Sequence, residues 1–442
     1  MIIREEVLKM KEAAPVLASS GVEQRNKALI LAASALEAGR DEIFAANKID
    51  LDSADANGVA PAVKKRLKFD EGKLSDVVKG LHQLAGLPDP LKKVTLAREL
   101  DEGLRLYRVT CPIGVIGVIF EARPDALVQI SSLCIKSGNC AILKGGKETA
   151  NTNRVLFRLI RESVMEAGLP GEILLQAEQH NEIDELLKCH DCVDLLIPRG
   201  SNAFVQYIMN NTKIPVMGHA DGICHIYVDK DYDPAKALPV ILDAKMQYTA
   251  ACNAAETLLV HRDIAADFLP RLAGACRENG IRLRGTAEAG DLLADCGKEA
   301  GDLIAGSAKA APFEVITEDD FIEYLDLVLS VKIVDSVDEA IAHINRYGSH
   351  HTDSILTENA DTAARFMEMV DSAGVYQNCS TRFADGFRYG FGAEVGISTG
   401  KIHARGPVGL EGLVTYKYKL FGSGHIVGDY AEGKRQFHFK DI

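Results

Sequence analysis

The sequence has 442 residues, a net charge of −13 and ten cysteines, with 47% hydrophobic and 26% charged residues. This length suggests roughly two to three domains, and the acidic balance argues against nucleic-acid binding, which usually needs a basic face. No run approaches the length of a membrane-spanning helix, and MIIREEVLKMKEAAPVL at the start lacks the apolar core of a signal peptide. The irregularly spaced cysteines do not form a disulfide framework, so we expect a cytoplasmic protein with reduced thiols.

The first part of the chain has the apolar spacing of helices. Val7, Met10, Ala14 and Leu17 recur at intervals of three and four residues, and similar patterns continue to about residue 80. The segment 100–109 then alternates charged and apolar residues around Gly103, which predicts a solvent-facing hairpin.

A β-α-β pattern follows and then repeats. Because strands alternate with helices of ten or more residues, we expect mostly parallel sheets covered on both faces. Strands are predicted at 114–120, 140–144, 171–176, 194–197, 258–260 and 374–378, and helices at 125–136, 149–167, 234–248, 264–279 and, after the capping box Ser336-Val-Asp-Glu339, up to 345. The segment 414–420 alternates like an edge or inter-subunit strand.

The segment ACNAAETLLVH at 251–261 places Cys252 among small side chains. Small neighbours leave space over the sulfur for a substrate carbonyl, and a thiolate is well suited to forming an acyl-enzyme. Taken alone, a cysteine among alanines is more often a small buried hydrophobic residue. The catalytic interpretation therefore depends on the rest of the chain.

Seven segments, in order over nearly the whole chain, resemble the aldehyde dehydrogenase superfamily and, within it, the gamma-glutamyl phosphate reductase family. They are CPIGVIGVIFEARPDALVQ (111–129), AILKGGKETANTN (141–153), LLIPRGS (195–201), CNAAETLLVH (252–261), SILTEN (354–359), NCSTRFADG (378–386) and GAEVGISTGKIHARGPVGLEGLVTYKY (392–418). The ARP at 122–124 and the STGKIHARGPVGLE at 398–411 are similar to the reductases in particular.

The resemblance implies an aldehyde-dehydrogenase-like α/β fold with two α/β domains, mainly parallel sheets and a small β oligomerisation element. Residues 1–230 are expected to bind NADP and to carry an oligomerisation hairpin near 96–110. Residues 231–390 are expected to form the catalytic domain with the nucleophilic cysteine. Residues 391–442 would return to the cofactor domain and end in an oligomerisation strand, which favours a homo-oligomer.

The implied reaction is the NADPH-dependent reduction of L-glutamyl 5-phosphate to L-glutamate 5-semialdehyde and phosphate, the second step of proline biosynthesis from glutamate. Cys252 would expel phosphate and form a thioester, with its own N–H and Asn253 as oxyanion donors. The superfamily's oxyanion asparagine is matched by Ala122, and no deacylating glutamate is evident, since we expect Glu256 to be structural. Both differences suit phosphate rather than water as the second substrate, because water needs a base to activate it.

The resemblance also implies a cofactor site and a substrate site. The cofactor residues are Lys144, Gly145, Lys147, Gly200, Ser201 and Glu323. Many NAD-specific relatives carry a glutamate where this chain has Lys147, and an ammonium attracts the 2′-phosphate that a carboxylate repels, so NADPH is expected over NADH. A solvated lysine at the start of a helix is the alternative. The candidates for binding the anionic groups of the substrate are Arg123, Arg382, Lys401, His403 and Arg405.

No metal site is expected, and the pair His350-His351 is expected to have hydrogen-bonding or structural roles. The chain has no kinase domain, so a separate glutamate 5-kinase would supply the substrate. Two alternatives stay open from the sequence. One is a CoA-acylating or hydrolytic aldehyde dehydrogenase, and the other is a catalytically silent nucleotide-binding protein of the same fold.

Overall fold

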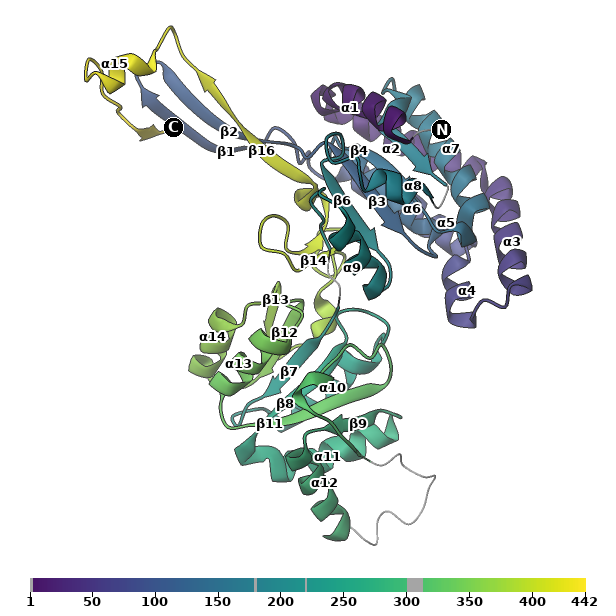
Figure 1. Ribbon diagram of the computed structural model, residues 1–442, viewed down its shortest axis with the longest axis vertical. Helices are drawn as coiled ribbons and strands as arrows, with labels where there is room; N and C mark the ends of the chain where they lie inside the picture. Colours follow the sequence, from purple (N-terminus) through teal and green to yellow (C-terminus); the bar gives the residue numbers. More distant parts are fainter. Residues whose placement is uncertain (1–2, 179–180, 219–220, 300–312) are drawn as a thin grey trace. The chain divides into compact units, whose positions relative to one another are not determined.

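A computed structural model describes residues 3–178, 181–218, 221–299 and 313–442 (Figure 1). The chain forms two compact units. Unit 1 comprises Met1–Gly218, Gly390–Ile397 and Ile402–Ile442, and unit 2 comprises His219–Tyr389 and Ser398–Lys401. No helix of the described residues is long and apolar enough to cross a membrane.

Unit 1 begins with helices, as the apolar spacing predicts. Val7, Met10 and Leu17 are buried along one face of the first helix, and the Asp70 carboxylate caps the fifth by accepting the Lys73 N–H at 3.1 Å. The helices are α1 (Ile3–Ser19), α2 (Val22–Ala38), α3 (Arg40–Ala56), α4 (Pro61–Leu67) and α5 (Glu71–Gly86).

A parallel four-stranded sheet in the order β5-β4-β3-β6 forms the centre of unit 1. Its strands are β3 (Val115–Phe120), β4 (Cys140–Lys144), β5 (Leu174–Ala177) and β6 (Leu195–Arg199). The helices α6 (Pro124–Lys136), α7 (Ala150–Glu166), α8 (Asn181–Leu186) and α9 (Asn202–Asn211) follow these strands in turn. Every residue of β3 and β4 is buried, which explains their continuous apolar runs. The strand predicted at 171–176 starts later, because Gly171–Ile173 forms a 3₁₀ turn after Pro170.

A second, antiparallel sheet of unit 1 contains the predicted hairpin. Its order is β16-β2-β1-β17, with β1 (Val94–Asp101), β2 (Leu104–Pro112), β16 (Val414–Phe421) and β17 (Lys440–Asp441). Gly103 lies in the turn between β1 and β2 with a φ of 73°, a conformation that favours glycine. After β16 and the short helix α15 (Val427–Ala431), the C-terminal segment returns to pair with β1 (Figure 1). The role of this sheet in oligomerisation stays a prediction.

Unit 2 is built on a seven-stranded parallel sheet in the order β10-β9-β11-β8-β7-β12-β13. The strands are β7 (Cys224–Val228), β8 (Ala255–His261), β9 (Arg282–Gly285), β10 (Glu314–Val315), β11 (Val328–Val334), β12 (Thr352–Leu356) and β13 (Gly374–Gln377). The helices are α10 (Pro234–Met246), α11 (Arg262–Glu278), α12 (Ala287–Glu299), α13 (Val337–Tyr347) and α14 (Ala360–Met369). The remaining two-stranded sheet pairs β14 (Gly396–Ser398) with β15 (Gly406–Val408), whose residues belong to unit 1 except for Ser398.

Side chains of the central strands of unit 2 alternate between two hydrophobic cores. Ile226 and Val228 of β7 pack in one core with residues of α10 and α11, whereas Tyr227 packs in the other with residues of α13 and α14. Leu259 of β8 lies in the same core as Tyr227, while its neighbours in β8 lie in the first. Because successive side chains of a strand point to opposite faces of the sheet, both faces of this sheet are apolar, and helices cover both of them.

A histidine lies in the core of unit 2. His343 of α13 is only 4% exposed, and its ring contacts the rings of Phe321 and Tyr347 with centroids 4.8 Å away in each case. Burial lowers the pKa of His343 to about 2, and the neighbouring His225 and then the positive charge of Lys332 add to this effect. The Lys332 ammonium donates to Nδ1 at 3.4 Å, which fits a neutral ring.

We expect His343 to weaken the fold in acid. Its pKa of about 2 in the folded chain lies below the ordinary value of 6.5, so the unfolded chain binds the additional proton between these values. The free energy of unfolding therefore falls as the pH drops below about 6.5, by up to about 1.4 kcal/mol per pH unit from this one group. Urea unfolding of wild type and His343→Gln between pH 7 and pH 5 measures the difference in slope. An equal slope would contradict the assignment, and exposed His190→Gln is the control.

Candidate active site

Cys252 lies at the edge of the unit 2 sheet where its central strands begin. The parallel strands β8, β7 and β12 are neighbours, so the segments just before them emerge side by side. Cys252 precedes β8, Gly222 precedes β7 and His351 directly precedes β12. The predicted cofactor residue Glu323 precedes β11, which lies on the other side of β8. The sheet topology therefore gathers residues that are far apart in the sequence.

The sulfur of Cys252 contacts a histidine ring. His351 Nε2 lies 3.2 Å from Cys252 Sγ, and the other ring nitrogen, Nδ1, lies 2.9 Å from the Thr352 hydroxyl. The His351 side chain is 1% exposed, while Cys252 is only partly buried. The sequence predicts a hydrogen-bonding or structural role for His351 but carries no signal that its partner is the sulfur, because 99 residues separate the two.

The backbone on each side of Cys252 is held closely. A Cβ atom on Gly222 would lie 2.0 Å from the Cys252 carbonyl oxygen, so only glycine fits there. The buried thiol of Cys224 donates to the same carbonyl at 3.4 Å. These contacts restrict where the loop that carries the sulfur can lie.

Asn253 connects the cysteine loop to the segment after β13. Its side-chain amide nitrogen donates to the Ala384 carbonyl at 2.8 Å, and its main-chain carbonyl oxygen accepts a hydrogen bond from the Thr381 hydroxyl at 2.7 Å. The Asn253 side chain is buried. In this structure the amide positions the loop, and its predicted role as an oxyanion donor stays a prediction.

Arg382 is the predicted substrate residue that lies near the sulfur. It is 8% exposed, and its Nε donates to the Gln247 side-chain oxygen at 2.9 Å. Burial lowers the pKa of Arg382 and the neighbouring Arg388 adds to this, whereas a negative charge on Cys252 acts in the opposite direction. A guanidinium so placed can attract an anion that approaches the thiol.

The other predicted substrate residues are distributed over both units. Lys401 belongs to unit 2, where its exposed ammonium pairs with the Asp371 carboxylate. Arg123, His403 and Arg405 belong to unit 1, and all three are exposed. The contacts of these residues within each unit do not test whether they bind the substrate, so their roles stay predictions.

Glu256 forms a buried ion pair in unit 2. Its carboxylate lies 2.6 Å from the Lys245 ammonium, and both side chains are fully buried. Burial raises the pKa of Glu256, while Lys245 and the N–H groups of Tyr324 and Leu325 oppose this shift. Glu256 thus links β8 to the segment that carries Glu323, which fits the structural role expected for it.

In unit 1, the predicted lysines lie together at the carboxyl end of β4. The buried Lys144 ammonium donates to the carbonyls of Gly145 at 2.9 Å and Glu178 at 3.4 Å, and burial lowers its pKa. Lys147 is exposed at the start of a 3₁₀ turn. A Cβ on Gly145 would lie 2.3 Å from the Asn153 side-chain nitrogen, so the turn requires glycine for packing against α7. Two cations at the end of a parallel strand fit a phosphorylated dinucleotide.

Gly200 and Ser201 precede α9 at the carboxyl end of β6, as the predicted pyrophosphate site requires. The Ser201 N–H donates to the Glu121 carboxyl group, which no sequence pattern predicts. Burial and the nearby Glu148 raise the pKa of Glu121. Glu121 thus contacts the backbone at the start of α9, beside the predicted pyrophosphate site.

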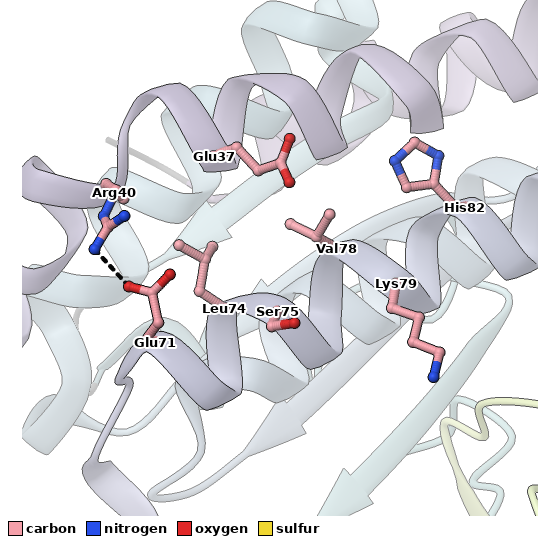
Figure 2. Close-up of a pocket in the computed structure, with 8 residues that line it drawn as sticks. All are labelled: Glu37, Arg40, Glu71, Leu74, Ser75, Val78, Lys79 and His82. Atoms are coloured by element: carbon pink, nitrogen blue, oxygen red, sulfur yellow. Dashed lines mark ion pairs between the residues drawn. The ribbon is translucent and has the colours of Figure 1, made fainter.

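A surface pocket of about 500 Å³ lies elsewhere in unit 1 (Figure 2). Leu74 and Val78 of α5 line it beneath polar side chains, and Arg40 pairs with Glu71 across one end at 2.6 Å. It contains none of the predicted site residues. Among the described residues, no three His, Cys, Asp or Glu side chains converge as metal ligands.

We expect the close approach at Gly222 to be required for activity. Gly222→Ala would push the Cys252 loop away from β7, and a shift of about 1 Å can lower turnover roughly a hundredfold. Turnover and thermal unfolding of the variant measure this effect. Gly274→Ala is the control, because a Cβ there meets nothing within 4 Å. Wild-type turnover in Gly222→Ala would contradict the argument.

Comparisons with known proteins show the family to which this chain belongs. The model of the aldehyde dehydrogenase family matches residues 3–282. The gamma-glutamyl phosphate reductase of Pelotomaculum thermopropionicum is 54% identical over 100% of this chain and 98% of its own. The crystal structure of the gamma-glutamyl phosphate reductase of Thermotoga maritima is 38% identical, with a TM-score of 0.90 over 96% of this chain and 100% of its own.

The fold also extends to more distant structures. A glyceraldehyde-3-phosphate dehydrogenase from Methanocaldococcus jannaschii, solved in complex with NADP, is 16% identical with a TM-score of 0.64. The structural match covers 95% of this chain and 94% of the dehydrogenase chain, and it shows that the two share a fold. The chain therefore belongs to the aldehyde dehydrogenase family and, within it, to the gamma-glutamyl phosphate reductases.

Proposed function

We propose that this enzyme reduces L-glutamyl 5-phosphate to L-glutamate 5-semialdehyde and phosphate with NADPH, the second step of proline biosynthesis from glutamate. The observation that carries the proposal is the environment of Cys252. Its partly exposed sulfur lies 3.2 Å from an imidazole nitrogen and close enough to the Arg382 guanidinium for their charges to interact. A nucleophilic thiol beside an anion-attracting cation suits an acyl phosphate.

In the first step, the Cys252 sulfur attacks the acyl carbon, the bond from carbon to the phosphate oxygen breaks, and a thioester forms. The N–H of Cys252 and the amide of Asn253 are the proposed donors to the oxyanion. Arg382 would hold one anionic group of the substrate, and Arg123, Lys401, His403 and Arg405 are the further candidates. The bound nicotinamide supplies the hydride that reduces the thioester.

Residues at the strand ends of unit 1 would hold that cofactor. Lys144 and Gly145 would bind the adenosine ribose. Gly200 and Ser201 would bind the pyrophosphate. The exposed Lys147 would bind the 2′-phosphate that distinguishes NADPH from NADH. In unit 2, Glu323 would hold the nicotinamide ribose. The charge of the two lysines supports this assignment, since neither forms an ion pair with a carboxylate of the described residues.

The proposed setting follows from the chemistry of the substrate. Acyl phosphates hydrolyse readily, so a separate glutamate 5-kinase would supply the substrate close to where it is used. We further propose a homo-oligomer that assembles through the antiparallel sheet of unit 1, where Tyr416, Tyr418 and Phe421 of β16 are exposed. The free cysteines of the described residues support a reducing compartment such as the cytoplasm.

We expect the purified protein to reduce NADP with glutamate 5-semialdehyde only when phosphate is present, because phosphate must release the acyl group from Cys252. Cys252→Ala should abolish this turnover, and Cys379→Ala, a change of another partly buried thiol in the same unit, should not. The absorbance of NADPH at 340 nm measures the turnover of both variants. Turnover without phosphate would favour a hydrolytic enzyme. Formation of a thioester with CoA would favour a CoA-acylating enzyme, and the absence of any turnover would favour a catalytically silent binding protein.

We expect Lys147→Glu to reverse the nucleotide preference. A carboxylate at this exposed position repels the 2′-phosphate, and loss of one charged hydrogen bond lowers kcat/KM for NADPH relative to NADH by roughly tenfold or more. Initial rates with both nucleotides give the ratio. Lys65→Glu, at an exposed lysine of α4, is the matched control. An unchanged ratio would assign Lys147 to the solvated surface.

A further inference from the structure

Transfer of an acyl group from phosphate to a thiol requires the movement of one proton. The thiol loses its proton as the sulfur attacks, and the departing phosphate oxygen gains one. A group in contact with the sulfur can take this proton and return it directly near neutral pH. Among the described residues, the side chain that forms a hydrogen bond with Cys252 Sγ is His351, with Nε2 at 3.2 Å.

The other ring nitrogen of His351 is oriented for this task. When Nδ1–H donates to the Thr352 hydroxyl at 2.9 Å, the lone pair of Nε2 faces the sulfur and can accept the thiol proton. After that transfer, both nitrogens carry protons, and Nε2–H donates to the thiolate while the bond to Thr352 persists. The two contacts thus accommodate both states of the pair without movement of the ring.

The surrounding backbone holds the ring in place. His351 is 1% exposed, and it follows His350, whose φ of 59° lies in the left-handed region. His350 has a different partner, since its Nδ1 contacts the Asp371 carbonyl at 2.6 Å. Adjacent histidines therefore have different partners, and only one of them contacts Cys252.

Two buried carboxylates of unit 2 are each paired with a side chain other than Cys252. The acidic residue nearest to Cys252 in the sequence, Glu256, is fully buried in its ion pair with Lys245. Asp353, on the same strand as Thr352, contacts the buried His225 ring at 2.9 Å. Both carboxylates are thus committed to other groups, whereas the His351 ring contacts the sulfur itself.

We propose that His351 is the acid–base catalyst for Cys252, an inference that rests on the proposed reductase activity. It takes the thiol proton as the carbon–sulfur bond forms, and it gives that proton to the phosphate oxygen as the carbon–oxygen bond breaks. When the thiohemiacetal later collapses, the carbon–sulfur bond breaks to give the aldehyde. Hydride addition leaves the oxygen of this intermediate without a proton, so the ring takes one proton from water to replace the one that left with the phosphate and gives it to the departing sulfur, and Cys252 is regenerated as a thiol.

The first test needs no substrate and is therefore independent of the proposed function. Iodoacetamide labels Cys252 at pH 7, and peptide mass spectrometry gives the rate at each cysteine. In His351→Ala we expect the Cys252 rate to fall roughly tenfold or more, because an imidazole partner increases the thiolate fraction. His351→Gln, which keeps the size but not the basicity, should behave like His351→Ala.

The chain offers matched controls for this measurement. His350→Asn alters the neighbouring histidine with a residue that tolerates positive φ, and it should label Cys252 within about twofold of wild type. Cys111 and Cys379 are partly buried thiols that serve as internal standards. Cys134 and Cys140 are buried, so their labelling would reveal a misfolded variant. Equal loss in His350→Asn and His351→Ala would make His351 structural and would overturn the proposal.

The second test uses turnover with glutamate 5-semialdehyde, phosphate and NADP. We expect His351→Ala to lower kcat roughly a hundredfold or more with little change in KM, and added imidazole to restore part of it. Wild-type turnover that persists within threefold in His351→Ala would overturn the proposal. If wild type itself lacks phosphate-dependent turnover, the proposed function fails, while the labelling rates still decide whether His351 activates Cys252.

Discussion

The common direction of the strands in unit 2 is the constraint on which its chemistry depends. Parallel strands all begin at one edge of a sheet, and β11, β8, β7 and β12 are consecutive there. Segments from four parts of the chain therefore meet at this edge. Cys252 and His351 are 99 residues apart in sequence and 3.2 Å apart in space for this reason. The order of the strands in the sheet therefore brings the Cys252 thiol and the His351 ring together.

Buried polar pairs keep these strands in position. Lys245 and Glu256 lie 2.6 Å apart, His225 and Asp353 lie 2.9 Å apart, and all four side chains are fully buried. Such pairs add little net stability, but removal of one partner costs about 3–5 kcal/mol because a charge remains buried. Any shift of β7, β8 or β12 would separate them. The pairs therefore restrict the alignment of the strands that carry the site.

Strained backbone accumulates beside the site residues. Six non-glycine residues of the described chain have positive φ, and four of them lie within two residues of a candidate site residue. These four are Ala122, Leu325, His350 and Ala404. Each such conformation costs on the order of 1–3 kcal/mol and persists only where surrounding contacts impose it. The neighbouring side chains are thus held in directions that a relaxed backbone would not give.

The sequence by itself predicted Cys252 as the nucleophile and determined the β-α-β order and the lysines at the end of β4, because these depend on local patterns and short motifs. It did not reveal β12, which contains Thr352, Asp353 and Ser354 and yet is wholly buried. Their polar groups find partners such as His225 and Ser372 only in the folded unit. Tertiary structure decided the pairing of His351 with Cys252, since contacts between distant segments depend on strand order, which no local pattern encodes.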